Sequence, residues 1–458
     1  MELIDIIIDF LPLFMFASLA ILLFSGYPVA FILGGLSLIY GFIGYAFDIF
    51  SIVEFFNFLP RIWGQAAENL VLVAVPTFVF MGVMMERSGV ANDMLYVCQV
   101  LLKKVPGGLA VAVAVMGTVL AAMTGIIGAS VTMMTALALP SMLKQGYKHE
   151  LATGVICASG TLGILIPPSI MLIIMADLLS ISVGDLFLAA LMPGLFLAAS
   201  YVIYIAVYAG IDRSVAPPLS ENELYVPRNE MPGLLVRSFF PPVFLIALIK
   251  GSILLGWATP SEAGAVGAFG ATLIALYNRR LNRGMINSVC QSSGLTISFI
   301  FFIIICATCF AYVFRSLGGD DVIEDLIRHA NLTSWGLLFL IMGIVFILGF
   351  FLDWVEITLI ILPVFAPMVA TLDFGDHVPL ENRATIYWFT VLIAINLQTS
   401  FLTPPFGYAL FYLKGIAPRE VDLMSIYRGI IPFVILQLIA LLFVIMIPTM
   451  ALWLPGLN

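Results

Sequence analysis

Charge is scarce in this sequence. Asp, Glu, Lys and Arg together make up 10% of its 458 residues, and 62% of the residues are hydrophobic. Soluble domains carry about 25% charged residues, and no water-soluble core could absorb this much apolar sequence. The net charge is −8 and no basic patch opposes it, so a nucleic-acid partner is excluded. The composition therefore indicates a polytopic membrane protein.

Metal-binding and catalytic residue types are also few. The three histidines, His149, His329 and His377, lie far apart in polar loops, so no transition-metal cluster can be assembled from them. The five cysteines lie in or beside apolar runs, which is typical of small buried residues. The chain has no G-x-x-x-x-G-K-[ST], G-x-S-x-G or H-E-x-x-H motif. ATP hydrolysis by this chain is excluded, and we expect neither an enzyme nor a cofactor other than a coupling ion.

Two long apolar runs are each interrupted by a pair of prolines, Pro167-Pro168 and Pro404-Pro405. Proline lacks a backbone N–H and restricts the residue before it, so a helix must break at both places. A break in lipid would leave carbonyls unpaired, so it is tolerated only inside protein or beside a water-filled cavity. The pairs lie 237 residues apart, about half the chain. One Pro-broken segment per half indicates the binding site of a secondary transporter.

The order of apolar segments repeats in the two halves. Residues 1–210 are predicted to hold three spans, a re-entrant hairpin at 107–143, a broken helix at 151–181 and a span at 186–209. A hydrophilic linker follows at 211–237. Residues 238–458 repeat the order, with a hairpin at 334–369, a broken helix at 384–414 and a span at 430–452. Five crossings per half would invert the second half, which predicts an all-α fold with two inverted repeats, two re-entrant hairpins and two discontinuous helices.

The remaining segments are shorter or amphipathic. The first three spans of the halves are expected at 11–24, 28–47 and 70–85, and at 238–255, 262–277 and 294–313. Residues 51–68 and 91–104 are expected to be amphipathic helices in the membrane interface. The opening residues lack the positive region of a signal peptide, so the first apolar run is expected to remain as a span. The first hairpin could also be two ordinary spans joined by a tight turn.

The distribution of Lys and Arg orients the chain. With the N-terminus outside, the inner loops hold 14 of the 19 Lys and Arg residues, and five remain outside. Cytoplasmic loops are the ones enriched in these residues. Both termini are therefore predicted to be periplasmic. The open end of the first hairpin would lie inside and that of the second outside, so that the two tips meet near the midplane.

Broken helices expose carbonyl oxygens that can replace the hydration shell of a small cation. Oxygen ligands without His or Cys suit a hard ion, Na⁺ above all. The first predicted Na⁺ site consists of Gly128, Ser130, Gly163, Ile166 and Pro167, the last two acting through their carbonyls. The second consists of Asp353, Ser400, Thr403 and Phe406. The same small residues would also suit close helix packing alone.

Uncharged polar residues precede both breaks and could bind a carboxylate or sulfonate. We expect the substrate to contact Ser159, Thr161, Asn396, Gln398, Thr399 and Glu356. Asp353 and Glu356 are carboxylates in an apolar hairpin, where charge is costly and usually functional, and either could bind Na⁺ or carry a proton. A second interpretation of Glu356 is a residue at the membrane rim that contacts water.

The chain resembles a known family, the large membrane (M, or DctM-like) subunit of tripartite ATP-independent periplasmic (TRAP) transporters. The resemblance spans essentially the whole chain. It rests on four segments, GTLGILIPPS (160–169), GWATPSEAG (256–264), GFFLDWVE (349–356) and NLQTSFLTPPFG (396–407). The family's first hairpin tip is often richer in Ser than Gly128-Ala129-Ser130, so ion binding there would rely more on carbonyls.

The resemblance implies a Na⁺-driven importer of the bacterial inner membrane that works by an elevator mechanism. It implies a separate four-helix Q subunit, since no Q-like extension precedes the first span, and a periplasmic solute-binding protein that delivers an organic anion. The substrate could be a C4-dicarboxylate, keto acid, aromatic acid, sulfonate or sugar acid. The other hypotheses are a secondary anion transporter that works without a binding protein, a passive channel, and a membrane enzyme.

Overall fold

The computed structural model describes residues 8–103, 105–125, 127–218, 231–329, 332–379, 381–404 and 407–457. Every regular element in these ranges is a helix. Six of the helices are at least 18 residues long and apolar enough to cross a membrane. Large apolar side chains such as Phe31, Phe42 and Trp257 are more than half exposed, which suits a surface that faces lipid rather than water. The predicted all-α polytopic membrane fold is confirmed.

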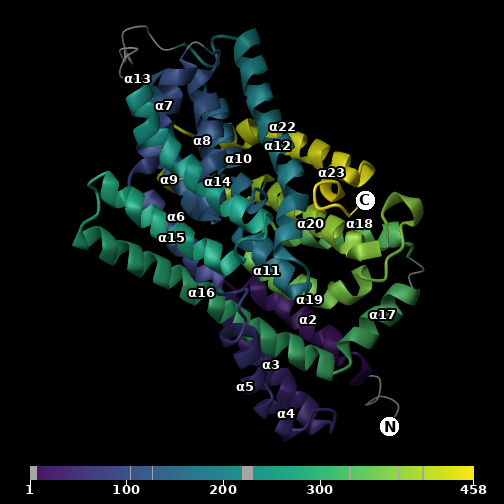
Figure 1. Ribbon diagram of the computed structural model, residues 1–458. Coiled ribbons are helices and arrows are strands. Elements are labelled where there is room, and N and C mark those ends of the chain that lie inside the picture. Colours follow the sequence, from purple (N-terminus) through teal and green to yellow (C-terminus); the bar gives the residue numbers. More distant parts are fainter. Residues whose placement is uncertain are drawn as a thin grey trace.

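The first half begins with two apolar helices and ends with a long one (Figure 1). Its helices are α2 (Leu11–Leu23), α3 (Val29–Ala46), α4 (Ile52–Phe56), α5 (Phe58–Ile62), the π-helical turn η1 (Trp63–Ala67), α6 (Ala74–Arg87), α7 (Val90–Leu102), α8 (Gly108–Thr124), α9 (Ile127–Lys144), α10 (His149–Thr161), the 3₁₀ turn η2 (Leu162–Ile164), α11 (Ile170–Leu178) and α12 (Val183–Ile211). The helices α8 and α9 form the first hairpin, and α10, η2 and α11 form the first broken segment.

The second half follows the same order after a short turn of helix. Its elements are α13 (Met231–Leu234), η3 (Leu235–Phe239), α14 (Phe240–Leu254), α15 (Pro260–Tyr277), α16 (Arg283–Ser316), α17 (Gly319–His329), α18 (Ser334–Leu348), α19 (Trp354–Val369), η4 (Gly375–His377), η5 (Glu381–Arg383), α20 (Ala384–Leu402), α21 (Tyr408–Ile416), α22 (Leu423–Met446) and α23 (Thr449–Leu452). The second hairpin is α18 and α19, and the second broken segment is α20 and α21.

Several predicted boundaries were wrong. The amphipathic helix expected at 51–68 is divided into α4, α5 and η1 at Asn57 and Trp63. The span expected at 294–313 is part of the 34-residue α16, because Asn282 caps an earlier start by accepting a hydrogen bond from the Met285 N–H. The last span starts seven residues earlier than expected because Asp422 caps it, and it ends before Pro448. The sequence analysis did not foresee α17 as a separate helix.

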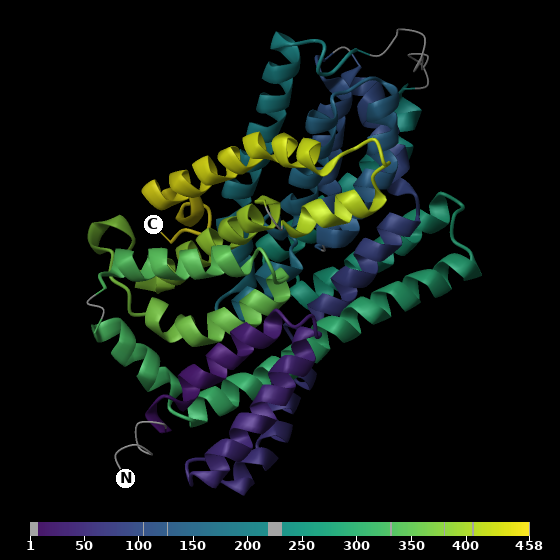
Figure 2. The same cartoon turned by 180° about the vertical axis from the view of Figure 1, so that it is seen from behind.

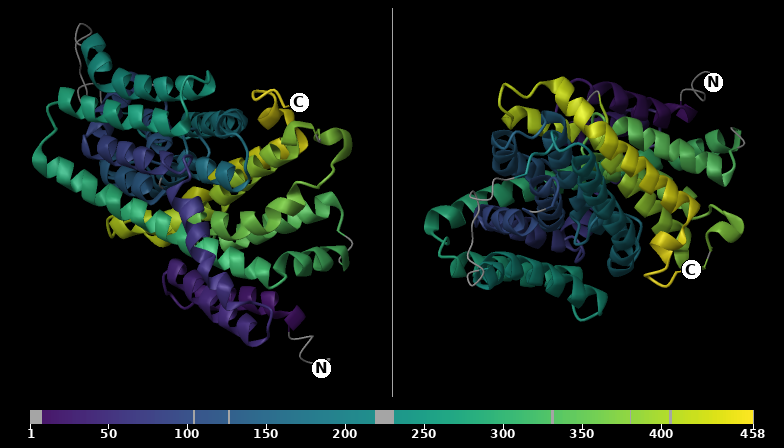
Figure 3. Two further views of the ribbon diagram at one scale, coloured as in Figure 1. Left: turned by 60° about the horizontal axis from the view of Figure 1, so that its bottom comes forward. Right: turned by 90° about the horizontal axis from the view of Figure 1, so that it is seen from above.

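Several helices of each half pack against helices of the other half, and the contacts are reciprocal. The helix α15 packs along α6 and α16 packs along α3. In the same way α22 packs on α10 and α20 on α12, while α9 contacts α21 and α19 contacts α11. Figures 2 and 3 show α22 running across α10 and the second broken segment. Each half therefore supplies the neighbours of the other, and the two broken segments lie in the middle of the assembly.

Glycines allow the closest of these helix crossings. A methyl group on Gly154 of α10 would overlap with the carbonyl of Gly429 in α22, and one on Gly429 would overlap with the carbonyl of Glu150. Because neither residue carries a Cβ, the two backbones touch directly, as in close-packed membrane helices. This contact joins the first broken segment to the last long helix.

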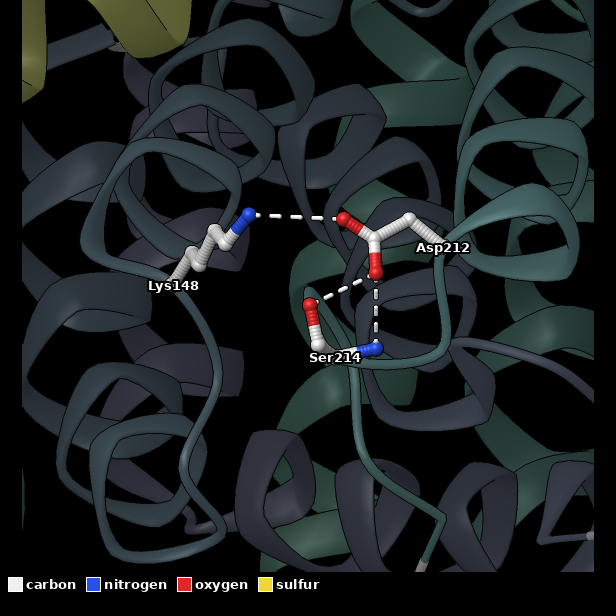
Figure 4. Close-up of polar contacts among 3 residues, drawn as sticks. All are labelled: Lys148, Asp212 and Ser214. Carbon is white, nitrogen blue, oxygen red and sulfur yellow. Dashed lines mark hydrogen bonds and ion pairs between the residues drawn. The ribbon is translucent and has the colours of Figure 1, made fainter.

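Hydrogen bonds and an ion pair connect the loop after α12 to the loop between α9 and α10 (Figure 4). The Asp212 carboxylate accepts hydrogen bonds from the Ser214 N–H at 3.0 Å and the Ser214 hydroxyl at 2.6 Å, and it pairs with Lys148 Nζ at 3.4 Å. The Lys148 N–H donates to the Val215 carbonyl at 3.0 Å. The two Ser214 bonds, and then Lys148, hold the pKa of Asp212 below its usual value.

Candidate functional site

At the first break, a few hydrogen bonds fix the backbone that connects α10 to α11. After η2, the Ile166 N–H donates to the Leu162 carbonyl at 3.0 Å, and Pro167 and Pro168 have no N–H to continue the helix. The Ser169 hydroxyl donates to the Ile164 carbonyl at 2.8 Å, and Ser169 caps α11 by accepting from the Leu172 N–H. Within the described ranges no hydrogen bond reaches the carbonyls of Ile166 and Pro167. Both residues are buried, so these oxygens can bind a ligand at little cost.

The tip of the first hairpin lies against this break. Gly125 links α8 to α9 with φ +60°, a conformation that favours glycine, and a methyl group there would lie 3.3 Å from the Ile170 nitrogen. Ser130 is buried on α9, and Gly163 is buried in η2. The methyl of an alanine at Gly160 would lie 2.6 Å from Val131, so α9 and α10 are in close contact just before the break. The structure thus brings the members of the first predicted Na⁺ site to adjoining elements.

The second break separates α20 from α21. The Thr403 N–H donates to the Ser400 carbonyl at 3.2 Å, its hydroxyl donates to the Thr399 carbonyl at 2.7 Å, and its carbonyl accepts from the Gly407 N–H. The hydroxyl oxygen of Thr403 keeps lone pairs for a cation. Phe406, the remaining predicted member of the second Na⁺ site at this break, lies outside the described residues.

The tip of the second hairpin meets the second broken segment. A methyl group on Gly349 would overlap with Ser400 Oγ, so the tip approaches α20 as closely as a backbone can. The Asn396 amide donates to the Met342 carbonyl of α18 at 2.7 Å, which holds the first arm of the hairpin to α20. Each hairpin tip therefore rests on the broken segment of its own half.

Asp353 and Glu356 start the second arm of that hairpin. Asp353 Oδ1 accepts from the Trp354 N–H at 2.8 Å, and Glu356 Oε2 accepts from the Asp353 N–H at 3.1 Å. The bond from the Asp353 N–H to Glu356 is one half of a capping box, while Asp353 itself accepts from the first N–H of α19. Each carboxylate thus uses one oxygen at the start of α19. Glu356 is buried with 8% exposure, which rules out the interpretation as a water-facing residue at the membrane rim. The second oxygen of each carboxylate remains for a cation.

Two tyrosines that were not predicted from the sequence join the halves. The rings of Tyr408 and Tyr412 of α21 pack edge to face with centroids 5.4 Å apart. Both interact electrostatically with Asp353 and Glu356. A methyl on Gly128 would lie 2.7 Å from the Tyr412 ring, so the first hairpin tip touches the segment beyond the second break. The signal that could have found them is two aromatic residues one turn apart directly after the break.

The predicted substrate residues are buried, and most of their hydrogen bonds are made within their own helices. Ser159 donates to the Val155 carbonyl, Thr161 to the Ala158 carbonyl and Thr399 to the Ile395 carbonyl. Gln398 donates to Thr161 Oγ1 at 3.4 Å, and its Oε1 has no partner within the described residues. The structure therefore clusters these residues between the two breaks. Their contact with a substrate stays a prediction.

One pair of residues at matching positions of the halves, and a second pair one residue away from matching, contact each other. Thr161 and Gln398 are 237 residues apart, which is the separation of the two proline pairs. Tyr201 and Gln437 are 236 residues apart, and the Gln437 amide donates to the Tyr201 hydroxyl at 2.8 Å. A residue meets its own counterpart only close to an axis that relates the two copies. The two halves are thus arranged around one centre, between the breaks.

The sequence matches the family model described as "Tripartite ATP-independent periplasmic transporter, DctM component" over residues 16–450. The chain belongs to this family. It is 30% identical over 395 residues to the C4-dicarboxylate TRAP transporter large permease protein DctM of Pseudomonas aeruginosa, covering 86% of this chain and 88% of that protein. The resemblance stated above is confirmed, and the chain is a component of a multi-pass membrane transporter.

Other relatives carry different substrate names. The ectoine TRAP transporter large permease protein TeaC of Halomonas elongata is 28% identical over 84% of this chain and 86% of its own. The isethionate TRAP transporter permease protein DctMQ of Oleidesulfovibrio alaskensis is 24% identical over 98% of this chain and 67% of its own. Among solved structures, the YdaH transporter of Alcanivorax borkumensis superposes with a TM-score of 0.57 at 13% identity, covering 88% of both chains. That structure, described as having an unusual topology, supports the fold of this DctM-family chain.

Proposed function

We propose that this chain is the large permease subunit of a Na⁺-driven TRAP transporter that imports a small organic anion. The observation that carries the proposal is the pairing of each interrupted helix with a hairpin tip. Gly125 contacts α11 beside the first break, and Gly349 contacts Ser400 beside the second. Two such pairings around one centre suit a midplane site that binds an ion and a solute together.

The ion-binding part of the proposal uses oxygen atoms alone. At the first site, the unpaired carbonyls of Ile166 and Pro167 would bind Na⁺ together with Gly128, Ser130 and Gly163. At the second, Asp353, Ser400, Thr403 and Phe406 would do so. The described residues contain no group of three or more His, Cys, Asp and Glu side chains that could hold a metal ion, so backbone and hydroxyl oxygens would have to complete each site.

The elevator part of the proposal divides the helices into two groups. The helices α2, α3, α6, α14, α15 and α16 would form a fixed scaffold, and the hairpins with the broken segments would move. The reciprocal packing of α15 on α6 and α16 on α3 supports two repeats related by a twofold axis. We place the axis in the membrane plane, so that the repeats are inverted and both termini are periplasmic.

The partners are proposed from the family. A small four-helix Q subunit would complete the membrane part in the bacterial inner membrane, and a periplasmic binding protein would deliver the solute. The names of the relatives suggest three solutes to test first, namely a C4-dicarboxylate, isethionate and ectoine. Ser159, Thr161, Asn396, Gln398, Thr399 and Glu356 would contact the solute after the hairpins open.

Uptake into proteoliposomes tests the proposal. The full chain is reconstituted with its small subunit, and the three solutes are supplied with the binding protein encoded beside it. We expect saturable uptake when Na⁺ is high outside, and loss of accumulation when an ionophore dissipates the Na⁺ gradient. Uptake that does not change after the gradient is dissipated would refute Na⁺ coupling.

The same preparation distinguishes the rival hypotheses. Accumulation without the binding protein would favour a secondary transporter that works alone. Conductance steps in a planar bilayer would favour a passive channel, because an elevator moves one solute per cycle and cannot conduct a stream of ions.

A further inference from the structure

A cavity of about 350 Å³ lies between the proposed scaffold and the proposed moving part. One wall is formed by α5, η1 and α16, including Arg61 and Arg315. The other wall is formed by the end of α11 and by α19, including Asp177 and Pro363. We call this space the two-arginine cleft. Its volume lies within the range of small-molecule sites.

The Arg61 guanidinium lies over an aromatic ring in this cleft. Its central carbon lies 4.1 Å from the centre of the Tyr312 ring, a cation–π contact. Tyr312 is itself fixed, because its hydroxyl accepts from the Asn57 amide at 3.1 Å and its ring packs edge-on against Phe58. No carboxylate among the described residues pairs with Arg61. Within the described residues the Arg61 N–H groups have no hydrogen-bond acceptor either, so the planar guanidinium can donate to a carboxylate or sulfonate.

Arg315 lies one turn after Tyr312 on the same helix. Its Nη2 donates to the Pro363 carbonyl of α19 at 2.8 Å, and its Nε lies 3.6 Å from the Asp320 carboxylate. The bond to Pro363 fixes the side chain across the cleft and uses one of five N–H donors. Both arginines are therefore positioned by neighbours and keep N–H donors that have no hydrogen-bond acceptor among the described residues.

Asp177 is the carboxylate of the opposite wall, and both of its oxygens already accept hydrogen bonds from side-chain amides. It accepts hydrogen bonds from the Asn69 amide at 2.8 and 2.9 Å and from the Gln65 amide at 3.0 Å. These three bonds direct the carboxylate towards the segment before α6 and occupy part of its acceptor capacity. The unused hydrogen-bonding capacity of the cleft is thus mainly of the donor type.

We infer that the two-arginine cleft is a second anion-binding site, which holds a small organic carboxylate or sulfonate before it reaches the midplane. The inference rests on the proposed function, because the cleft lies on the face proposed to be periplasmic. Arg61 and Arg315 bind the anionic group through their free N–H edges. This site needs no Na⁺, since arginine supplies the positive charge. The midplane site is proposed to need Na⁺ for the same purpose.

Binding without Na⁺ separates the two sites. The full chain in lipid nanodiscs is titrated with succinate and with isethionate in choline buffer, and binding is followed by saturation-transfer NMR. We expect saturable binding to the wild type. Arg61→Gln and Arg315→Gln should each weaken it about tenfold, the loss typical of one hydrogen bond to a charged group. Arg61→Lys keeps the charge without the planar fork, and it should give an intermediate affinity.

Two control variants make the result specific. Arg328→Gln removes an equal charge from α17, where the Arg328 side chain is 73% exposed and pairs with Glu324, so it should bind like the wild type. Thr403→Val alters the proposed Na⁺ site and should also bind like the wild type in choline. Circular dichroism and gel filtration confirm that each variant is folded.

Three outcomes would overturn the inference. They are no saturable binding to the wild type in choline, unchanged binding to the Arg61→Gln, Arg315→Gln double variant, and binding that requires Na⁺ and is lost in Thr403→Val. The third outcome would place the anion at the midplane and leave the proposed function intact. Failure of Na⁺-driven uptake, in contrast, would refute the proposed function without affecting Na⁺-free binding to the cleft.

Discussion

The two hairpin units share a backbone plan but differ in charge. The first unit has no charged side chain at its tip or break, so its cation would be held by the carbonyls of Ile166 and Pro167 with Ser130. The second unit has Asp353 and Glu356 at its tip and a hydroxyl, Thr403, at its break. The same backbone arrangement can therefore form a neutral site in one half and an acidic site in the other. The acidic site should dominate the affinity for Na⁺ because it alone supplies a full negative charge.

The largest expected effect comes from removing that charge. Asp353→Asn keeps an oxygen to accept from the Trp354 N–H, so α19 should remain capped. Losing a charged ligand should lower Na⁺-driven uptake roughly 100-fold, from the upper end of the cost of one charged hydrogen bond. Uptake is measured against external Na⁺ in proteoliposomes. Ser130→Ala, in the neutral unit, should have a clearly smaller effect, and an equal effect would refute the difference between the units.

The next effect tests the contact between tip and break. Gly349→Ala would force its methyl onto Ser400 Oγ, and overpacking of this kind costs about 1–3 kcal/mol. We expect a lower melting temperature and reduced uptake. Ser400→Gly in the same chain removes the clashing atoms and should restore the melting temperature, whereas uptake should stay reduced because Ser400 belongs to the proposed Na⁺ site. Absence of rescue would mean that the hairpin tip does not rest on Ser400 in the membrane.

A smaller effect is expected at the second break itself. Thr403 occupies the position that Ile166 has in the first half, 237 residues earlier, where no side-chain oxygen is present. Thr403→Val therefore makes the second break resemble the first. The Na⁺ concentration for half-maximal uptake should rise about tenfold, the effect of losing one hydrogen-bonding group. An unchanged Na⁺ titration would remove Thr403 from the site.

The smallest effect is expected outside the membrane, at Asp212. Its pKa is lowered in the folded chain, so its contribution to stability is present above the usual carboxyl pKa and is lost as the pH falls through the folded value. The group is exposed, so Asp212→Asn should lower the melting temperature only slightly at pH 7 and by less at pH 3. A larger loss at pH 3 than at pH 7 would contradict this sign.

Much of this fold could be predicted from the sequence. A proline pair interrupts a helix at its own position, and the length of an apolar run shows whether it can span the membrane. Pro167-Pro168 and Pro404-Pro405 must interrupt any helix. In the structure the first break lies at 165–169, and around the second α20 ends at Leu402 and α21 starts at Tyr408. The start of α16 was missed because its first turns are polar and only the Asn282 cap marks them. Hydropathy identifies the part of a helix that crosses lipid, and it does not show how far the helix continues in water.

The candidate site was less predictable than the fold. Ser159, Thr161 and Thr399 were chosen for their hydroxyls, but each hydroxyl donates to its own helix, which a sequence pattern cannot exclude. Tyr412 was missed because its contact with Gly128 joins residues that are distant in sequence. The Thr161–Gln398 contact could have been foreseen, because the spacing of the proline pairs already relates these two positions.

The orientation of the hairpins is the central claim, and cysteine labelling tests it most directly. In a chain with exposed Cys290 replaced by Ser, K144C marks the open end of the first hairpin and T371C that of the second, both at exposed positions. A membrane-impermeant maleimide is added to the periplasmic side. We predict that T371C is labelled at once and that K144C is labelled only after the inner membrane is permeabilised. Labelling of both positions from the same side would contradict the inverted arrangement on which the account depends.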